Sequence, residues 1–285
     1  MASIQSCLRE SSRLENYSDT ARLDAEILLC TAIEKDRAYL YTWPEKIISP
    51  EQLSRYQNYL TRREQGEPIA YITGYQEFWS LNIAVNPSTL IPRPETELLV
   101  ELALELAGEN KDKKTLLDLG TGTGAIALAI ASERPQWQIT ALEKNPDALA
   151  LAQSNQKTHR LDNVTLVLSD WFSALIEGEH RFDVIVANPP YIDKNDEHLS
   201  QGDVRFEPAS ALVAEQSGLD DLAHIVSVAP QFLKENGLLL VEHGYQHQQA
   251  VAEFFKQHGY SDCFCKLDLA GQPRVSGGLV KPSKI

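Results

Sequence analysis

The chain has 285 residues, enough for two domains, one of which can hold a complete α/β sheet. Its net charge of −14 repels phosphate backbones and argues against broad binding of nucleic acid. Four scattered cysteines exclude a disulfide framework, no apolar run can span a bilayer, and the first residues lack a signal-peptide pattern. The composition therefore predicts a cytosolic globular protein.

Residues 1–74 show helical patterns and no catalytic constellation. Ser18 and Asp19 offer N-caps for a helix with Leu23, Ile27 and Leu28 on its apolar stripe. The charge of this segment is almost balanced, unlike that of the rest of the chain. We therefore expect a small helical bundle that recognises a macromolecular partner.

Residues 75–90 are predicted to form a β-hairpin that links two domains. Apolar residues alternate with polar or small ones over Trp79–Val85, and Asn86–Pro87 marks a turn. A helix is expected to open within Ile91–Glu97, with Leu106 among the apolar residues that face the sheet.

From Thr115 onward, strands alternate with helices, which is typical of a parallel sheet covered on both faces. Two further strands near the C-terminus are expected to pair as a hairpin. The predicted strands are Thr115–Leu119, Gln138–Glu143, Val164–Ser169, Phe182–Ala187, Leu238–Glu242, Cys263–Leu267 and Arg274–Val280.

A glycine-rich turn follows the first of these strands and opens a helix. It consists of Asp118, Leu119, Gly120, Thr121, Gly122, Thr123 and Gly124. A dinucleotide site is the first alternative, but the spacing is G-x-G-x-G, and a carboxylate beside the turn would repel a pyrophosphate. A sulfonium cofactor that carries an ammonium group suits Asp118 better. The turn therefore favours S-adenosyl-L-methionine.

Two more strand ends carry groups that suit the adenosine part of that cofactor. Glu143 lies about twenty residues past the glycine turn, the separation at which a carboxylate accepts from ribose hydroxyls. Asp170 is a candidate acceptor from the adenine amine, and Trp171 is a candidate packing partner for the ring. A lone tryptophan is more commonly a core residue, so the case depends on all three strand ends together.

The fourth strand ends in Asn188-Pro189-Pro190-Tyr191, which we predict to be the catalytic corner. The prolines remove two backbone donors and leave carbonyl acceptors, while Asn188 adds a side-chain acceptor and Tyr191 an aromatic face. Such a corner suits a planar NH2 group whose nitrogen attacks an electrophile. His243 follows a later strand, but nothing in its spacing indicates a catalytic base.

Together, these motifs resemble those of class I S-adenosylmethionine-dependent methyltransferases that act on amide or amino nitrogen. Over nearly the whole chain, the sequence is similar to the peptide chain release factor N5-glutamine methyltransferases. The stretches that carry this resemblance are Arg22–Leu28, Pro68–Gly74, Ile91–Glu97 and Arg205–Pro208. One departure is Glu143, where such sheets commonly carry Asp; its longer side chain can still reach a ribose.

The resemblance implies an α/β fold: a Rossmann-like seven-stranded methyltransferase sheet in residues 91–285, an N-terminal all-α bundle in 1–74 and a β-hairpin linker in 75–90. It implies methyl transfer to the glutamine of the Gly-Gly-Gln loop of class 1 release factors, with S-adenosyl-L-homocysteine as product. The Asn188–Tyr191 corner would hold the target amide, and Asn188 would also border the cofactor. No metal, membrane or direct nucleic-acid partner is expected.

Three alternatives remain open on sequence alone. An adenine-N6 nucleic-acid methyltransferase uses the same corner but must bind and flip a base, which the acidic charge disfavours. A non-catalytic protein-binding module is disfavoured by the intact glycine turn and corner. A dehydrogenase is the weakest alternative because of the glycine spacing. Separately, Cys263 and Cys265 do not indicate a zinc site, because the sequence has no second ligand pair at zinc-site spacing.

Overall fold

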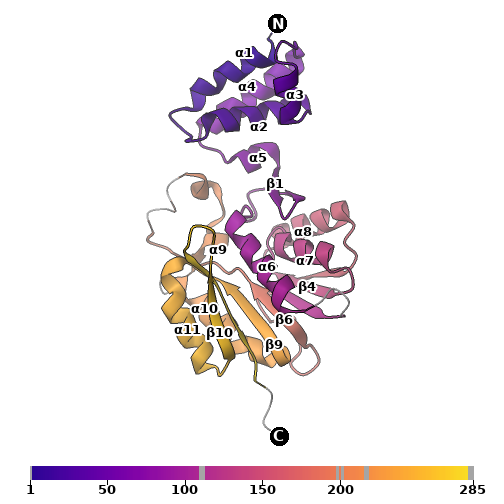
Figure 1. Cartoon of the computed structure of the whole chain (residues 1–285), viewed down its shortest axis with the longest axis vertical. Helices are drawn as coiled ribbons and strands as arrows, with labels where there is room; N and C mark the ends of the chain where they lie inside the picture. The colour runs from indigo at the N-terminus through magenta and orange to yellow at the C-terminus, as the bar shows by residue number, and fades with distance from the viewer. Residues whose placement is uncertain (1, 109–112, 197–198, 200–201, 215–217, 282–285) are drawn as a thin grey trace. The chain divides into compact units, whose positions relative to one another are not determined.

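The computed structural model describes residues 2–108, 113–196, 199, 202–214 and 218–281 (Figure 1). Its contacts divide the chain into two compact units. The helical unit contains residues 1–75 and 200–206, and the sheet unit contains residues 76–199 and 207–285.

The helical unit packs short helices around a core that includes Tyr56 and Leu60. Ser49 and Gln52 form a capping box at the start of the helix Pro50–Glu64, in which each residue's side chain accepts from the other's backbone N–H. Its elements, as far as the structure describes them, are α1 (Ile4–Arg9), η1 (Glu10–Leu14), α2 (Ala21–Ile33), α3 (Arg37–Thr42), α4 (Pro50–Glu64), α5 (Ile69–Thr73) and η4 (Asp203–Phe206).

The apolar stripe predicted for α2 is wrong in part. The helix begins one residue later than expected, with Thr20 at the N-cap position, and Leu23 is 38% exposed. Leu28 is buried as predicted, and Ala25 and Leu29 share the buried face with it. Because α2 also buries two carboxylates, Asp24 and Glu26, hydrophobicity alone does not identify its inner face.

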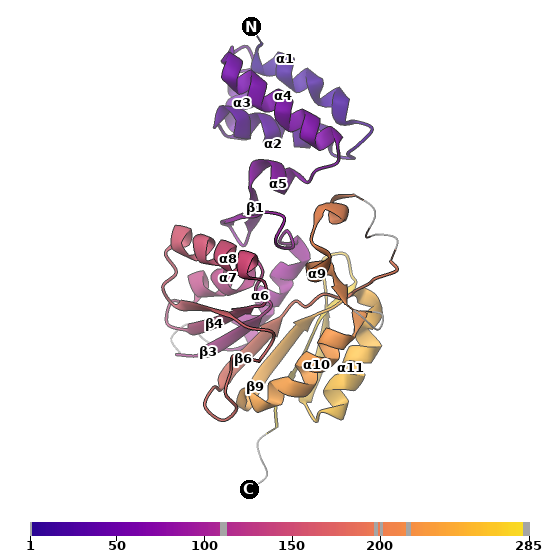
Figure 2. The same ribbon diagram turned by 180° about the vertical axis from the view of Figure 1, so that it is seen from behind.

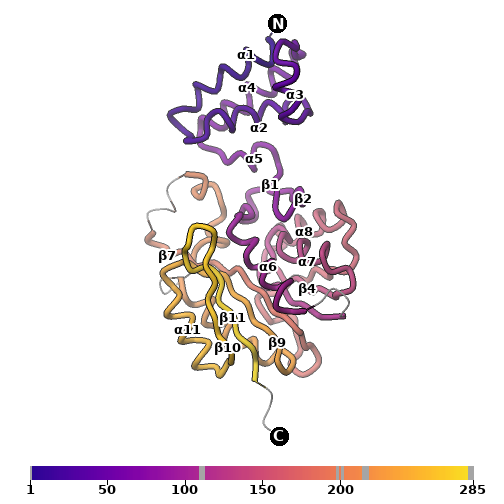
Figure 3. Tube along the Cα trace, viewed as in Figure 1, coloured from indigo at the N-terminus to yellow at the C-terminus, as the bar shows by residue number. Residues whose placement is uncertain are grey.

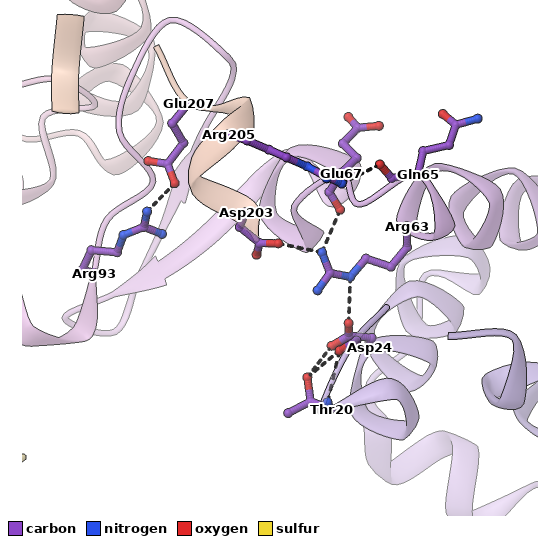
Figure 4. A network of polar contacts seen from close by, with 10 residues as sticks. Thr20, Asp24, Arg63, Gln65, Glu67, Arg93, Asp203, Arg205 and Glu207 are labelled. Carbon is purple, nitrogen blue, oxygen red and sulfur yellow. Dashed lines mark hydrogen bonds and ion pairs between the residues drawn. The ribbon is translucent and has the colours of Figure 1, made fainter. Parts of the chain in front are cut away.

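A buried guanidinium lies at the centre of a polar network in the helical unit (Figure 4). Arg63 donates from Nε to Asp24 and from a terminal nitrogen to Asp203, each over 2.8 Å. Arg205 donates to the backbone carbonyl of Gln65 over 3.0 Å. By their contacts, residues 200–206 thus belong to this unit. The predicted division, which ends the helical part at residue 74, does not include them.

The hairpin consists of β1 (Tyr75–Phe78) and β2 (Leu81–Ala84), traced in Figure 3. Its turn is Trp79–Ser80, so the expected placement of Trp79 in a strand is wrong. Both turn residues have positive φ, 52° and 61°, as a type I′ turn requires. Glu97 and Glu77 stabilise the turn because they accept from the backbone N–H groups of Trp79 and Ser80.

The sheet unit contains a seven-stranded sheet in the order β10-β11-β9-β6-β3-β4-β5. β9, β6, β3, β4 and β5 are parallel, and β11 pairs antiparallel with both β9 and β10. This confirms the Rossmann-like fold and the terminal hairpin. The strands are β3 (Thr115–Leu119), β4 (Gln138–Glu143), β5 (Val164–Leu168), β6 (Phe182–Ala187), β9 (Leu233–Glu242), β10 (Ser261–Leu267) and β11 (Pro273–Leu279), with a small separate pair of β7 (Ile192–Asp193) and β8 (Val213–Ala214).

Helices cover both faces of this sheet (Figures 1 and 2). Side chains from α6 and α7 share one core with one face, and side chains from α10 and α11 share a second core with the other. Leu106, expected to face the sheet, is 45% exposed at the end of α6. The remaining elements are η2 (Pro94–Thr96), α6 (Glu97–Leu106), α7 (Ala125–Glu133), α8 (Pro146–His159), α9 (Ala209–Leu212), α10 (Asp220–Val228), η6 (Ala229–Gln231), η7 (Tyr245–His247) and α11 (Gln248–Gln257).

Within the described residues, no helix has both the length and the apolar character that crossing a membrane requires.

Candidate active site

A cavity of about 420 Å³ lies at the carboxyl ends of the parallel strands in the sheet unit. This volume falls in the range of small-molecule and cofactor sites, and the location is where open α/β sheets bind ligands. Nine of the predicted site residues line it: Gly120, Thr121, Gly122, Thr123, Glu143, Asp170, Trp171, Asn188 and Pro190. Four others, Asp118, Gly124, Pro189 and Tyr191, are not among its lining residues.

The glycine turn carries the chain from β3 into α7 along the cavity wall. Gly120 has a φ of +70°, and a Cβ at this position would come within 3.3 Å of the Trp171 ring. The backbone conformation therefore favours glycine, and a larger residue would also require the indole to move by a few tenths of an ångström. The turn is fixed from β4, since Gly120 donates to the carbonyl of Leu142 and Gly122 donates to Glu143.

Glu143 ends β4 and holds two backbone donors. One carboxylate oxygen accepts from Gly122 and the other from Asn145, each over 2.8 Å. These bonds orient the side chain at the cavity wall and leave further lone pairs on each oxygen. Its contact with a ribose remains a prediction.

Asp170 and Trp171 follow β5 at the same edge of the sheet. Asp170 pairs with Lys144 over 2.9 Å, and both side chains are largely exposed. Trp171 has a φ of +47°, an unfavourable conformation for a bulky residue, and its indole N–H donates to Asp221 over 3.2 Å. Strained backbone of this kind is concentrated at functional sites, which supports a ligand-facing role for the indole.

Asp118 lies beneath the glycine turn rather than at the cavity. Its side chain is fully buried, one oxygen accepts from the Thr121 hydroxyl over 2.6 Å, and the other has no hydrogen-bond partner among the described residues. Burial raises the pKa of this carboxyl to about 7. In this structure, Asp118 shapes the turn, and a direct contact with the cofactor's ammonium group stays a prediction.

Asp118→Asn is expected to flatten the dependence of stability on pH between about pH 4 and pH 7. In this interval, the folded protein keeps a proton on Asp118 that the unfolded chain has released, so wild-type stability falls as the pH rises. The loss is on the order of a few kcal/mol. Urea unfolding of both proteins across the interval measures it, with the exposed Asp19→Asn as control; parallel curves for Asp118→Asn and wild type would contradict the expectation.

The catalytic corner begins where β6 ends. The side-chain NH2 of Asn188 donates to the Thr96 hydroxyl over 3.2 Å, and the Tyr191 hydroxyl donates to Glu242 over 3.2 Å. Burial is the main cause that raises the pKa of Tyr191, and it raises the pKa of Glu242 to about 7. The expected packing of the Tyr191 ring on a target amide stays a prediction.

His243 is buried beside this corner and takes part in structural contacts. Its ring nitrogens bond the Gly244 carbonyl over 2.9 Å and the Ser276 hydroxyl over 2.8 Å, and burial lowers its pKa. It is not a lining residue of the cavity. These contacts agree with the prediction of a polar residue at a strand end.

Several residues at the site escaped sequence reasoning. Thr96 lies inside the stretch Ile91–Glu97, whose acidic residues suit helix capping as well as a site role, and it lines the cavity beside Asn188. Asp221 lines the cavity and fixes Trp171, but a pair of acidic residues at a helix start also suits simple capping. Glu207 accepts from Ile91 and pairs with the cavity residue Arg93 (Figure 4). It lies in Arg205–Pro208, one of the stretches that carry the family resemblance, but the sequence predicts no partner for its carboxylate.

Among the described residues, no group of three or more His, Cys, Asp or Glu side chains is arranged to hold a metal ion.

Two protein-family models match the chain. The PrmC N-terminal domain matches residues 8–74, and the methyltransferase small domain matches residues 95–261.

Solved methyltransferases share the fold at low sequence identity. A methyltransferase from Pyrococcus furiosus has a TM-score of 0.54 at 18% identity, over 79% of this chain and 100% of its own. A 16S rRNA methyltransferase from T. thermophilus, in complex with AdoMet and guanosine, has a TM-score of 0.54 at 19% identity, over 73% of this chain and 50% of its own. At such identities the likeness extends to the fold alone.

Curated relatives match over almost the whole length. A release factor glutamine methyltransferase from Shewanella oneidensis is 51% identical over 279 residues, covering 96% of both chains. The protein of that name from Pseudomonas aeruginosa is 51% identical over 278 residues, covering 98% of this chain and 99% of its own. The one from Escherichia coli K12 is 47% identical over 274 residues, covering 96% and 98%. With both parts of the sequence matched at this level, the chain belongs to the release factor glutamine methyltransferase family.

Proposed function

We propose that this protein transfers a methyl group from S-adenosyl-L-methionine to the side-chain amide nitrogen of the glutamine in the Gly-Gly-Gln loop of class 1 release factors, and so supports translation termination. One observation carries the proposal: a single cavity is bordered both by the glycine turn and by Asn188 and Pro190. A cofactor site and an acceptor for a planar NH2 group are thus combined in one space.

The lining residues fit the proposed cofactor. The glycine turn lets backbone approach a ligand closely, Glu143 and Asp170 offer carboxylate acceptors, and Trp171 offers an aromatic face. When bound, S-adenosyl-L-methionine supplies an electrophilic methyl group on a sulfonium. We propose Gly120–Gly124, Glu143, Asp170 and Trp171 as its contacts, with S-adenosyl-L-homocysteine as product and no metal.

The corner would act by holding the nucleophile. An amide nitrogen is a poor nucleophile because its lone pair is delocalised into the carbonyl. Acceptors at the Asn188 side chain and the Pro189 carbonyl would take its two hydrogens and fix the nitrogen toward the methyl group, while Tyr191 packs on the amide plane. Positioning of this kind can lower the activation free energy by ~7–11 kcal/mol. A base is needed only when the methylated nitrogen loses its proton.

The two parts of the chain would have different roles. We propose residues 1–74 as the substrate-recognition domain, residues 75–90 as the linker and residues 91–285 as the methyltransferase domain. The substrate would be a protein, with no membrane or direct nucleic-acid partner. A release factor substrate would place the reaction in the cytoplasm.

Transfer of radiolabel from S-adenosyl-L-methionine tests the proposal. The purified protein is incubated with a class 1 release factor, with the same factor carrying Gln→Ala in its Gly-Gly-Gln loop, and with duplex DNA. Label on the wild-type factor alone is the expected result. Label on DNA would support the adenine-N6 alternative, and label on both factor variants would exclude the loop glutamine as the target.

A further inference from the structure

Behind the catalytic corner, four side chains of the sheet unit form two hydrogen-bonded pairs. The Asn188 NH2 group donates to the Thr96 hydroxyl, and the Tyr191 hydroxyl donates to the Glu242 carboxylate, each over 3.2 Å. Thr96 and Glu242 are 4% and 1% exposed, so solvent does not compete for these groups. Glu242 is the last residue of β9, and no step of the proposed mechanism uses it.

The Glu242 carboxylate is only partly satisfied. One oxygen accepts from Tyr191, whereas the other has no hydrogen-bond partner among the described residues. Burial raises the pKa of Glu242, and the neighbouring Thr96 hydroxyl opposes this rise because it favours the ionised carboxylate. A buried carboxylate oxygen without a donor is costly, and the Thr96 hydroxyl is a donor within reach.

The direction of the hydroxyl hydrogen decides what Asn188 presents to the substrate. A hydroxyl has one hydrogen, and if it points to Glu242, only the lone pairs of Thr96 remain for Asn188. The amide of Asn188 must then offer its NH2 group to Thr96. Its oxygen stays free for the hydrogens of a target nitrogen, whereas a reversed amide would set one NH2 group against another.

We infer that Glu242 is a positioning residue that acts through Thr96 to keep the side-chain oxygen of Asn188 facing the target nitrogen. This inference rests on the proposed function. It assigns Thr96 to the orientation of the catalytic amide and Glu242 to the orientation of the Thr96 hydroxyl.

Substitutions that remove one hydroxyl or one charge test this inference. Thr96→Val keeps the shape of the side chain and removes the hydroxyl, Thr96→Ser keeps the hydroxyl, and Glu242→Gln removes the charge. Thr115→Val is a matched control, because the Thr115 hydroxyl bonds Asp183 at the opposite end of the sheet. Assays at about pH 8.5 keep wild-type Glu242 ionised, since its pKa is about 7.

Thr96→Val is expected to lower kcat for release factor methylation about 10- to 100-fold, with cofactor Kd and release factor KM changed less than about 3-fold. Thr96→Ser should retain at least about one third of the wild-type kcat, and Thr115→Val should not change it. Glu242→Gln should lower kcat about 10-fold, and the variant with both Thr96→Val and Glu242→Gln should be no slower than Thr96→Val alone. A wild-type kcat for Thr96→Val, or losses that multiply in the double variant, would overturn the inference.

A second measurement does not depend on any substrate. The side-chain NH2 signal of Asn188 in the NMR spectrum, assigned by its loss in Asn188→Ala, reports the hydrogen bond to Thr96. It should shift and exchange faster with solvent in Thr96→Val and Glu242→Gln but not in Thr115→Val; an unchanged signal in the first two would overturn the inference. If wild-type protein fails to methylate the release factor, the proposed function falls, and the NMR comparison still decides the role of Glu242.

Discussion

Asn188→Ala is expected to slow methyl transfer to the release factor about 10²- to 10³-fold, while the Kd of S-adenosyl-L-methionine changes less than about 3-fold. The side-chain oxygen of Asn188 is the acceptor proposed for the reacting nitrogen, so its loss affects alignment of the nucleophile more than binding of the cofactor. Single-turnover rates with saturating cofactor, combined with calorimetric Kd values, separate the two effects.

Asn163→Ala is the matched control for this substitution. The Asn163 side chain donates to the backbone carbonyls of Ala131, Arg134 and Trp137, far along the sheet from the corner. Its loss should reduce stability without changing the single-turnover rate. Equal losses of rate and cofactor affinity in Asn188→Ala would instead assign Asn188 to cofactor binding.

The sequence predicts those parts of the fold that depend on neighbouring residues. Strands β3, β4 and β6 have the predicted bounds, because buried parallel strands are continuous apolar runs that end in polar or glycine residues. The hairpin turn was misplaced because Trp79 and Ser80 adopt positive φ without the Asn or Gly that usually indicates it. Contacts from Glu97 and Glu77 hold that turn, and local propensity does not reveal them.

The same distinction separates the predicted site residues from those that were missed. The glycine turn and the Asn188 corner are contiguous motifs, each with its own chemical logic. Thr96 and Glu242 reach the corner from positions 92 residues before Asn188 and 51 residues after Tyr191. Only the pairing of β9 with β6 and the placement of η2 bring them together, and no spacing rule in one sequence indicates that.

The helical unit provides the clearest case of a contact that sequence reasoning could not foresee. Asp203 lies 140 residues from Arg63 and pairs with it (Figure 4). Arg63 thereby holds two carboxylates, and its own side chain and that of Asp24 are both less than a tenth exposed. Such an ion pair is costly to break, because the remaining partner keeps an uncompensated charge in a poorly solvated place.

Arg63→Leu is therefore expected to destabilise the helical unit by about 3–5 kcal/mol. The aliphatic side chain of leucine retains part of the packing. Most of the loss therefore comes from the Asp24 carboxylate, which keeps the hydrogen bond from the Thr20 hydroxyl but loses its buried cation. Because the chain has two units, global unfolding can hide a local change. Hydrogen exchange of amides in α2 and α4, compared with amides in β3, measures the helical unit by itself.

Two further variants test whether the loss comes from the buried ion pair. Arg13→Leu removes a more exposed ion pair with Glu64 and should cost about 1 kcal/mol or less. The double variant with Asp24→Asn and Arg63→Leu also removes the unpaired charge of Asp24, so it should recover part of the stability lost in Arg63→Leu. Faster exchange confined to α2 and α4, and partly reversed in the double variant, would show that the buried ion pair stabilises this unit. A loss in Arg63→Leu no larger than that in Arg13→Leu, or no recovery in the double variant, would contradict it.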